Sequence, residues 1–152
     1  ETEAARQVSV VAETSGKIVS PPLRKGAFVQ EGEELTIITY GTLVHVAQAA
    51  AEATGVDCEV IDVRTIAPLD KETLANSVNK TGRCLVAHEA TRFAGFGAEI
   101  VARVQKECFW NLEAPVGRIA GWDTPYPHAF EWQYFPGKTR LMAGIEAMME
   151  IE

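Results

Sequence analysis

The stretch that decides the fold is LTIITYGTLVHVAQAAAEATGVDCEVIDV, residues 35–63. It opens with an apolar, β-branched run at Leu35–Tyr40 and closes with a second one at Cys58–Val63, and both runs are typical of buried strands. Gly41 breaks the first run, and Thr42 is a good N-cap for a following helix. The apolar residues between the two runs fall on one helical face: Leu43, Val46, Ala47 and Ala50. A strand, a helix and a strand in this order predict parallel strands joined by a helical crossover.

The same alternation continues to the end of the chain. Asp70 is expected to cap a helix that runs to about Lys80 and ends at Gly82. Further strands are expected at Ala27–Gln30, Arg83–His88 and Pro115–Ala120. Further helices are expected from Gly95-Phe96-Gly97 and from about Lys138, the last one turning Leu141, Ile145 and Met148 inward. This pattern predicts an α/β fold, in which helices cover both faces of a mostly parallel sheet.

Composition narrows the function. The chain has 152 residues, 47% of them hydrophobic, which suits one domain with a real core. A net charge of −7 without a basic run argues against nucleic-acid binding, and no apolar run is long enough to cross a membrane. The three cysteines, Cys58, Cys84 and Cys108, are far apart, which argues against a disulfide scaffold and a metal site. Cys58 and Cys84 lie in apolar runs and are expected to be buried reduced thiols.

The ends of the chain suggest a domain boundary. Residues 1–17 lack a convincing period and are interpreted as a linker or lead-in, which leaves residues 18–152 as the domain. The chain begins with Glu1 and not with Met, so it is either a processed product or a piece of a longer protein, and the second is expected.

Glycines and polar residues at the expected strand ends define a candidate anion-binding crevice. In an open α/β sheet, ligands gather at the carboxyl ends of the strands, and helix N-termini there favour negative charge. The candidate residues are Gly41, Thr42, Arg64, His88, Gly95 and Gly97. The alternative is that the glycines only permit tight turns and that Arg64 pairs with Glu89 or another carboxylate.

His88-Glu89 allows a second, catalytic hypothesis, because a carboxylate can orient an imidazole. This requires the strand to end before the pair, since neighbouring strand residues point to opposite faces. The alternative is a structural histidine beside a surface glutamate. No nucleophile elbow, phosphate loop or dinucleotide-binding glycine motif accompanies the pair, so a complete enzyme of another kind is disfavoured.

The loop expected at Gly121–Gly137 is rich in proline and aromatic residues. Long loops in compact domains are often functional, and Trp and Tyr are enriched at interfaces. The sequence therefore offers a candidate subunit or partner interface at Trp122, Asp123, Tyr126, His128, Trp132, Tyr134 and Phe135. The alternative is a loop held over the domain by its own aromatic side chains.

Six segments, in their order along the chain, resemble the C-terminal domain of the beta subunits of 2-oxo acid dehydrogenases. The resemblance covers roughly residues 18–150, and the last two segments are most similar to the branched-chain subfamily; pyruvate and acetoin dehydrogenases are the alternatives. The segments are LTIITYGTLVHV (35–46), CEVIDVRTIAPLD (58–70), SVNKTGRCLVAHEA (77–90), GFGAEI (95–100), QKECFWNLEAP (105–115) and GWDTPYPHAFE (121–131).

The resemblance implies a fold and a parent activity. The fold is a three-layer α/β/α domain of the transketolase C-terminal type, with five strands and one antiparallel edge strand, for which Ala27–Gln30 is the candidate. The parent enzyme would oxidatively decarboxylate branched-chain 2-oxo acids on thiamine diphosphate and Mg²⁺. The acyl group would then pass to the lipoyl arm of a dihydrolipoyl acyltransferase.

The resemblance also implies that this domain assembles rather than catalyses. In the family, the cofactor site and catalytic groups lie in the alpha subunit and in the preceding beta domain. No catalytic, cofactor-binding or metal-binding residue is therefore assigned here. The implied partners are the rest of the beta subunit, the alpha subunit in an alpha2-beta2 tetramer, and the acyltransferase's subunit-binding domain. The implied location is the bacterial cytoplasm or the mitochondrial matrix. The alternative from another class is a standalone anion-binding regulatory domain.

Overall fold

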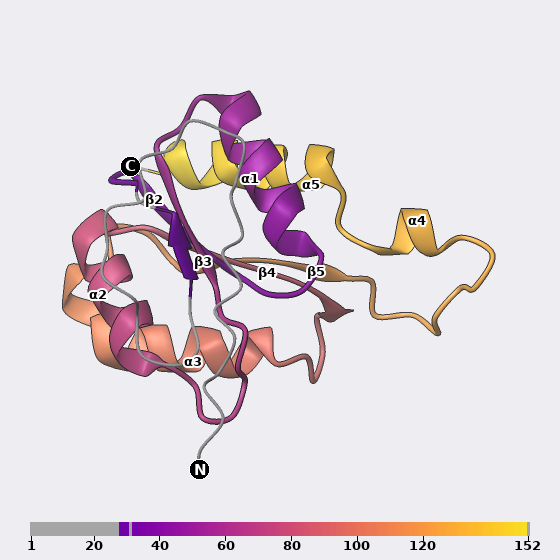
Figure 1. The fold of residues 1–152 in the computed structure, drawn as a ribbon, viewed down its shortest axis with the longest axis horizontal. Helices are drawn as coiled ribbons and strands as arrows, with labels where there is room; N and C mark the ends of the chain where they lie inside the picture. The colour runs from indigo at the N-terminus through magenta and orange to yellow at the C-terminus, as the bar shows by residue number, and fades with distance from the viewer. Residues whose placement is uncertain (1–27, 31, 152) are drawn as a thin grey trace, which may run out of the picture.

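A computed structural model describes residues 28–30 and 32–151, and these residues form a five-stranded sheet between two helical layers (Figure 1). The order of the strands is β1-β3-β2-β4-β5. β1 lies at one edge and pairs antiparallel with β3, whereas β2 to β5 are parallel. The strands are β1 (Phe28–Gln30), β2 (Leu35–Thr39), β3 (Cys58–Asp62), β4 (Cys84–Thr91) and β5 (Gly117–Gly121).

Helices cover both faces of the sheet (Figure 1). α1 (Leu43–Thr54) and α5 (Lys138–Met149) lie on one face, and α2 (Lys71–Thr81) and α3 (Gly97–Cys108) lie on the other. The α/β/α architecture and its antiparallel edge strand agree with the expectation from the sequence. Ala27 and the lead-in expected at residues 1–17 lie outside the described residues.

Strand alternation divides the core into two apolar clusters. Leu35 and Ile37 of β2 point toward α1 and α5, where they meet Leu141 and Ile145. Ile38 points to the other face, in the same cluster as residues of α2 and α3 such as Val78, Ile100 and Val104. Each side chain named here is at most 2% exposed. Side chains that share one face of a strand or helix recur with a fixed period, so these periods alone identified most of the core. The three cysteines are buried and free, as expected for Cys58 and Cys84.

Local capping signals account for several helix ends. The Asp70 carboxylate accepts a hydrogen bond from the Thr73 amide at 3.1 Å and so caps α2. Gly55 and Gly82 end α1 and α2 in the left-handed conformation, which glycine adopts without steric cost. The expectation for Thr42 was wrong in one respect. It sits at the N-cap position of α1, but its side chain makes no capping hydrogen bond.

Three other details differ from the sequence-based expectation. β4 runs to Thr91, beyond the expected end at His88, because Thr91 still pairs with Gly121 of β5 after an irregularity. The expected loop Gly121–Gly137 contains a short helix, α4 (Glu131–Tyr134). A 3₁₀ helix at Phe109–Asn111 follows α3.

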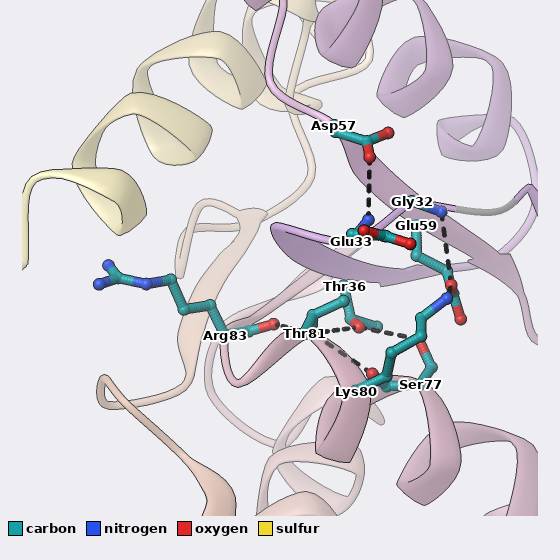
Figure 2. A network of polar contacts seen from close by, with 9 residues as sticks. All are labelled: Gly32, Glu33, Thr36, Asp57, Glu59, Ser77, Lys80, Thr81 and Arg83. Carbon is teal, nitrogen blue, oxygen red and sulfur yellow. Dashed lines mark hydrogen bonds and ion pairs between the residues drawn. The ribbon is translucent and has the colours of Figure 1, made fainter.

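A polar network ties α2 to the sheet near the start of β2 (Figure 2). The Thr36 hydroxyl lies 2.8 Å from the hydroxyls of both Ser77 and Thr81, and all three residues are buried. Nearby, the carboxylate of Glu59 pairs with Lys80 and accepts a hydrogen bond from the Gly32 amide. Because every one of these polar groups has a partner, the network is compatible with burial and fixes the register of α2 on β2.

Candidate functional site

The carboxyl ends of β3, β2 and β4 lie next to one another, as the strand order requires. The candidate crevice residues follow or belong to these ends: Gly41 and Thr42 after β2, Arg64 after β3, and His88, Gly95 and Gly97 at β4 and the start of α3. The structure therefore gathers them at one end of the sheet. Most of these residues, however, are already engaged in contacts with other residues of the chain.

Thr42 is engaged by a carboxylate. Its hydroxyl donates a hydrogen bond to Glu89, which lies 47 residues further along the chain. Burial and the neighbouring charge of Glu89 both raise the pKa of Tyr40, with burial the larger cause. A negative side chain beside Thr42 opposes the binding of an anion at this position.

Arg64 also has a carboxylate partner, which is Asp62 and not Glu89. Its Nε lies 3.0 Å from Asp62 Oδ2, and its amide donates to Oδ1 of the same residue at 3.2 Å. Arg64 has a φ of 52°, which is uncommon for a residue with a side chain, and the two contacts to Asp62 hold it in that conformation. This pairing matches the structural alternative for Arg64.

His88 is completely buried and fills the space against the start of α3. A Cβ added at Gly97 would lie 2.1 Å from His88 Nε2, and one added at Gly95 would lie 2.8 Å from Cε1. The ring stacks on Tyr40 at a centroid distance of 6.1 Å. Gly95 and Gly97 are thus required for close packing of an imidazole.

The catalytic hypothesis for His88 and Glu89 fails on geometry. Because β4 continues to Thr91, the two side chains point to opposite faces of the sheet. His88 packs toward α3, whereas Glu89 contacts Thr42 on the other side. The carboxylate therefore does not orient the imidazole, and the pair does not form an acid–base unit.

The segment between β5 and α5 carries several exposed aromatic side chains. It extends beyond the end of the sheet and carries α4 (Figure 1). Trp122 is 53% exposed and Trp132 is 69% exposed, and Tyr126, Asp123 and His128 are exposed as well. These five residues satisfy the accessibility that the interface hypothesis requires.

Two predicted interface residues serve a different role. Tyr134 is only 6% exposed, because its ring packs edge-on against Tyr126 and Phe135 at centroid distances of 5.4 Å. The expectation that Tyr134 offers a contact surface was therefore wrong. Tyr134 and the half-buried Phe135 support Tyr126, whose hydroxyl donates a hydrogen bond to Glu131. This bond is the largest cause that raises the pKa of Tyr126, to about 12.

Phe93 is an exposed aromatic residue that the sequence did not single out. Its side chain is 80% exposed, yet its backbone is fixed: the amide donates to Asp123 Oδ1 at 2.7 Å, and the carbonyl accepts from the Thr91 hydroxyl at 2.6 Å. The next residue, Ala94, has a φ of 58°. Because Asp123 is 30 residues away, no local pattern could have revealed that the backbone of Phe93 is fixed by Asp123 while its side chain stays exposed.

A second exposed aromatic pair, Phe109 and Trp110, lies at the other end of the sheet. Trp110 is 92% exposed, and the two rings meet edge-on at 5.0 Å. The Glu113 amide donates to the Gly82 carbonyl, which places this region beside the start of β4. The pair is thus separate from the aromatic residues around Trp122.

Residues 24–141 match the family model for the transketolase C-terminal domain. The chain belongs to the transketolase C-terminal domain family. The sheet and its two helical layers are those of this family, and a solved structure agrees at the level of fold. That structure is a split-gene transketolase described as an inactive beta4 tetramer, with a TM-score of 0.68 and 24% identity, over 89% of this chain and 46% of the other.

Relatives with closer sequences to this transketolase C-terminal domain are dehydrogenase beta subunits. The 2-oxoisovalerate dehydrogenase subunit beta of Pseudomonas aeruginosa is 59% identical over 130 residues, which is 86% of this chain. The mitochondrial subunit of the same name from Dictyostelium discoideum is 44% identical over 132 residues, 84% of this chain. The chain spans 37% and 36% of the lengths of these two relatives.

Among the described residues, no group of three or more His, Cys, Asp or Glu side chains could hold a metal ion. No described helix is long and apolar enough to cross a membrane.

Proposed function

We propose that this domain is the C-terminal part of the beta subunit of a thiamine-dependent dehydrogenase for branched-chain 2-oxo acids, where it acts in assembly. The observation that carries the proposal is the 59% identity over 130 residues to a 2-oxoisovalerate dehydrogenase beta subunit. Identity at this level over most of the chain supports a shared role.

In this proposal the parent enzyme supplies the chemistry. It decarboxylates a branched-chain 2-oxo acid on thiamine diphosphate with Mg²⁺ and transfers the acyl group to a lipoyl arm. The isolated chain is inactive and binds neither group, because the cofactor site belongs to the alpha subunit and the preceding beta domain. The enzyme works in the bacterial cytoplasm or the mitochondrial matrix; the Dictyostelium relative is named as mitochondrial.

The proposed assembly surface, called here the aromatic surface, consists of Phe93, Trp122, Tyr126, Phe130 and Trp132. Each is between 40% and 80% exposed, and large exposed aromatic residues are common anchors of protein interfaces. The surface is held firmly: Asp123 fixes Phe93, and Arg140 lies 4.4 Å from the ring centroid of Trp122. A rigid surface loses less conformational entropy on binding, which supports a role in stable association. Its partners would be the alpha subunit, the other beta subunit or the acyltransferase's subunit-binding domain.

The anion-binding alternative has weaker support. Thr42 donates a hydrogen bond to Glu89, and Arg64 forms a salt bridge with Asp62. Gly95 and Gly97 pack closely against the ring of His88. A saturable change in Trp fluorescence on titration with phosphate, sulfate or small carboxylates would support the anion-binding alternative.

The proposal can be tested with a chimera. The matching C-terminal segment of the Pseudomonas aeruginosa beta subunit is replaced with residues 24–152 of this chain and co-expressed with the corresponding alpha subunit. We expect a heterotetramer by size-exclusion chromatography, and activity with 2-oxoisovalerate that clearly exceeds activity with pyruvate. A folded chimera that does not associate with the alpha subunit would refute the assembly role. Preference for pyruvate would refute the assignment to branched-chain substrates.

Matched variants locate the surface. In the chimera, Trp132→Ala removes an anchor of the aromatic surface, and Trp110→Ala removes an equally large exposed ring at the other end of the sheet. We expect Trp132→Ala to weaken association with the alpha subunit or with the acyltransferase about tenfold or more, as loss of a central aromatic anchor does. Trp110→Ala should leave both associations within about twofold. Equal effects of the two variants would contradict the choice of surface.

A further inference from the structure

His88 is a buried polar side chain without an ordinary hydrogen bond. Its relative exposure is 0%, and neither Nδ1 nor Nε2 has a partner of normal geometry among the described residues. Buried polar groups are nearly always paired, so an unpaired imidazole in a core demands a physical explanation. Neither the assembly surface nor the parent reaction uses this residue.

Close packing holds the ring in place. Gly97 and Gly95 come so close that any side chain on Gly97 would overlap the imidazole, and Tyr40 stacks on it with an interplanar angle of 3°. Phe96, the N-cap residue of α3, packs edge-on against Tyr40. The start of α3 is therefore closed directly onto the ring, with no room for a rearranged charged group.

The surroundings disfavour a positive charge on His88 from three sides. Burial is the main cause that lowers the pKa of His88, and the guanidinium of Arg118 on β5 lowers it further. The ring also faces the positive end of the α3 dipole. Tyr40, from the end of β2, is a neutral phenol whose pKa is itself raised by burial and by Glu89. Only the backbone of Ala90 on β4 favours the imidazolium.

The same turn connects His88 to the aromatic surface. Between β4 and α3 the chain passes through Phe93 and through Ala94 with its positive φ, and it reaches the helix only at Gly97. The first-turn amides of α3 donate to the carbonyls of Gly95 and Phe96. Movement of Gly95–Gly97 away from the ring would break these bonds and also release the turn that presents Phe93.

We propose that His88 is an acid-sensitive latch: the neutral ring keeps the start of α3 closed, and protonation opens the 92–97 turn together with Phe93. The latch depends only on contacts within this chain, and so it stands or falls independently of the proposed function.

The direction of the pH effect follows from linkage. The pKa of His88 is lower in the folded chain than the ordinary histidine value of 6.5, so the open state binds the proton more tightly. The closed state is therefore fully favoured above pH 6.5. Its advantage falls as the pH drops below 6.5 toward the folded pKa, with uptake of at most about one proton on opening.

Amide hydrogen exchange on the 152-residue chain, corrected for intrinsic rates, tests the latch at Ala98, Glu99 and Ile100. Between pH 7 and pH 5 we expect protection at these amides to fall severalfold, because the open state takes up the proton that the closed state disfavours. His128→Gln, which removes an exposed histidine, should keep this fall, and His88→Gln should abolish it. Protection that is independent of pH in the unaltered chain, or that still falls in His88→Gln, would overturn the proposal.

Two further measurements keep the test decisive if His88→Gln does not fold. In the unaltered chain, the ring signal of His88 must titrate below pH 6.5 with the same midpoint as the loss of protection; a ring that titrates without any change in exchange would also overturn the proposal. Gly97→Ala adds a Cβ 2.1 Å from the ring and should loosen the turn already at pH 7. Gly137→Ala, where an added Cβ meets no atom within 4 Å, should leave exchange at these amides unchanged.

Discussion

The guanidinium carbon of Arg140 lies 4.4 Å from the centre of the Trp122 ring. Arg140 comes from α5, whereas Trp122 follows β5, so this contact ties the exposed aromatic segment to the helical layer. The same guanidinium donates to the Ala120 carbonyl at 2.7 Å and to the Tyr134 carbonyl at 3.5 Å. One side chain thus holds both ends of the Gly121–Tyr134 segment.

Replacing Arg140 with Lys should loosen this segment. A lysine keeps the charge but cannot stack its planar group on Trp122 while donating to both carbonyls, so we expect a loss of about 1–2 kcal/mol in the free energy of unfolding. Urea unfolding gives the loss, and near-UV circular dichroism reports the order of the Trp122 ring. Arg103→Lys is the control, because Arg103 only pairs with Glu99 on the surface of α3, and it should change stability by less than about 0.5 kcal/mol. Equal losses in the two variants would rule out a special role for Arg140.

Two threonines of β2 provide a test of buried hydrogen bonding. Thr36 and Thr39 are both 0% exposed, but the Thr36 hydroxyl has two partners at 2.8 Å whereas the Thr39 hydroxyl has none among the described residues. Replacing Thr36 with Val should cost about 1–3 kcal/mol, because it leaves the buried Ser77 hydroxyl without its partner, whereas the Thr81 hydroxyl keeps its bonds to the Ser77 and Arg83 carbonyls. Replacing Thr39 with Val should be neutral or stabilising, because it removes an unpaired buried polar atom. Urea unfolding of the two variants under identical conditions should give this order, and the reverse order would contradict the assigned hydrogen bonds.

The sequence predicted features that depend on neighbouring residues, and it missed features that depend on contacts between residues far apart in the chain. Asp70 and Thr42 are both favoured N-cap types, and only Asp70 caps its helix. Its partner, Thr73, is three residues away, so local propensity decides the outcome. Thr42 bonds instead to Glu89, whose position beside it is created only by the pairing of β2 with β4. The core was predictable for the same reason as the Asp70 cap, because the strand and helix periods that mark buried residues can be read from a few consecutive residues.

The candidate site depended on contacts that are distant in sequence. The extension of β4 past His88 requires a pairing of Thr91 with Gly121, and this extension is what separates His88 from Glu89. The burial of Tyr134 requires its packing on Tyr126, and the exposure of Phe93 requires Asp123. None of these pairings leaves a periodic pattern in the sequence, so an anion crevice and a catalytic pair remained open until the strands were placed.

The buried thiols should be unreactive in the folded chain. Burial is the main cause that raises the pKa of Cys58 from 9.0 to about 12, and it also raises the pKa values of Cys84 and Cys108. Since the thiolate is the reactive form, a thiol reagent at pH 8 should modify the folded chain about a hundredfold more slowly than the unfolded chain. Colorimetric titration should count three thiols only in denaturant, and two for Cys58→Ala.

The same shifts predict a loss of stability in alkali. The folded pKa of each thiol lies above the unfolded value of 9.0, so the unfolded state gives up its proton first. The contribution to stability is complete below pH 9.0 and is lost as the pH rises from 9.0 toward the folded values. Cys58→Ala should weaken this alkaline loss in urea unfolding measured at pH 8 and pH 10.

For the reactivity prediction, rapid modification of all three thiols in the folded chain would show that these side chains are not buried.

Asp123 should determine how firmly Phe93 is presented. Its carboxylate accepts from the Phe93 amide at 2.7 Å, and Asp123→Ala removes that acceptor while the Phe93 side chain, 80% exposed, has little packing to replace it. We expect hydrogen exchange at the Phe93 amide to accelerate about tenfold and the free energy of unfolding to fall by about 1 kcal/mol. Asp123→Asn keeps an oxygen at the same position and should restore most of the protection. Phe93→Ala, which leaves the backbone contact intact, should change stability by less than about 0.5 kcal/mol. If Asp123→Ala left exchange at this amide unchanged, the turn would have to be fixed by the Thr91 hydroxyl alone, and the aromatic surface would not depend on the link between β4 and β5.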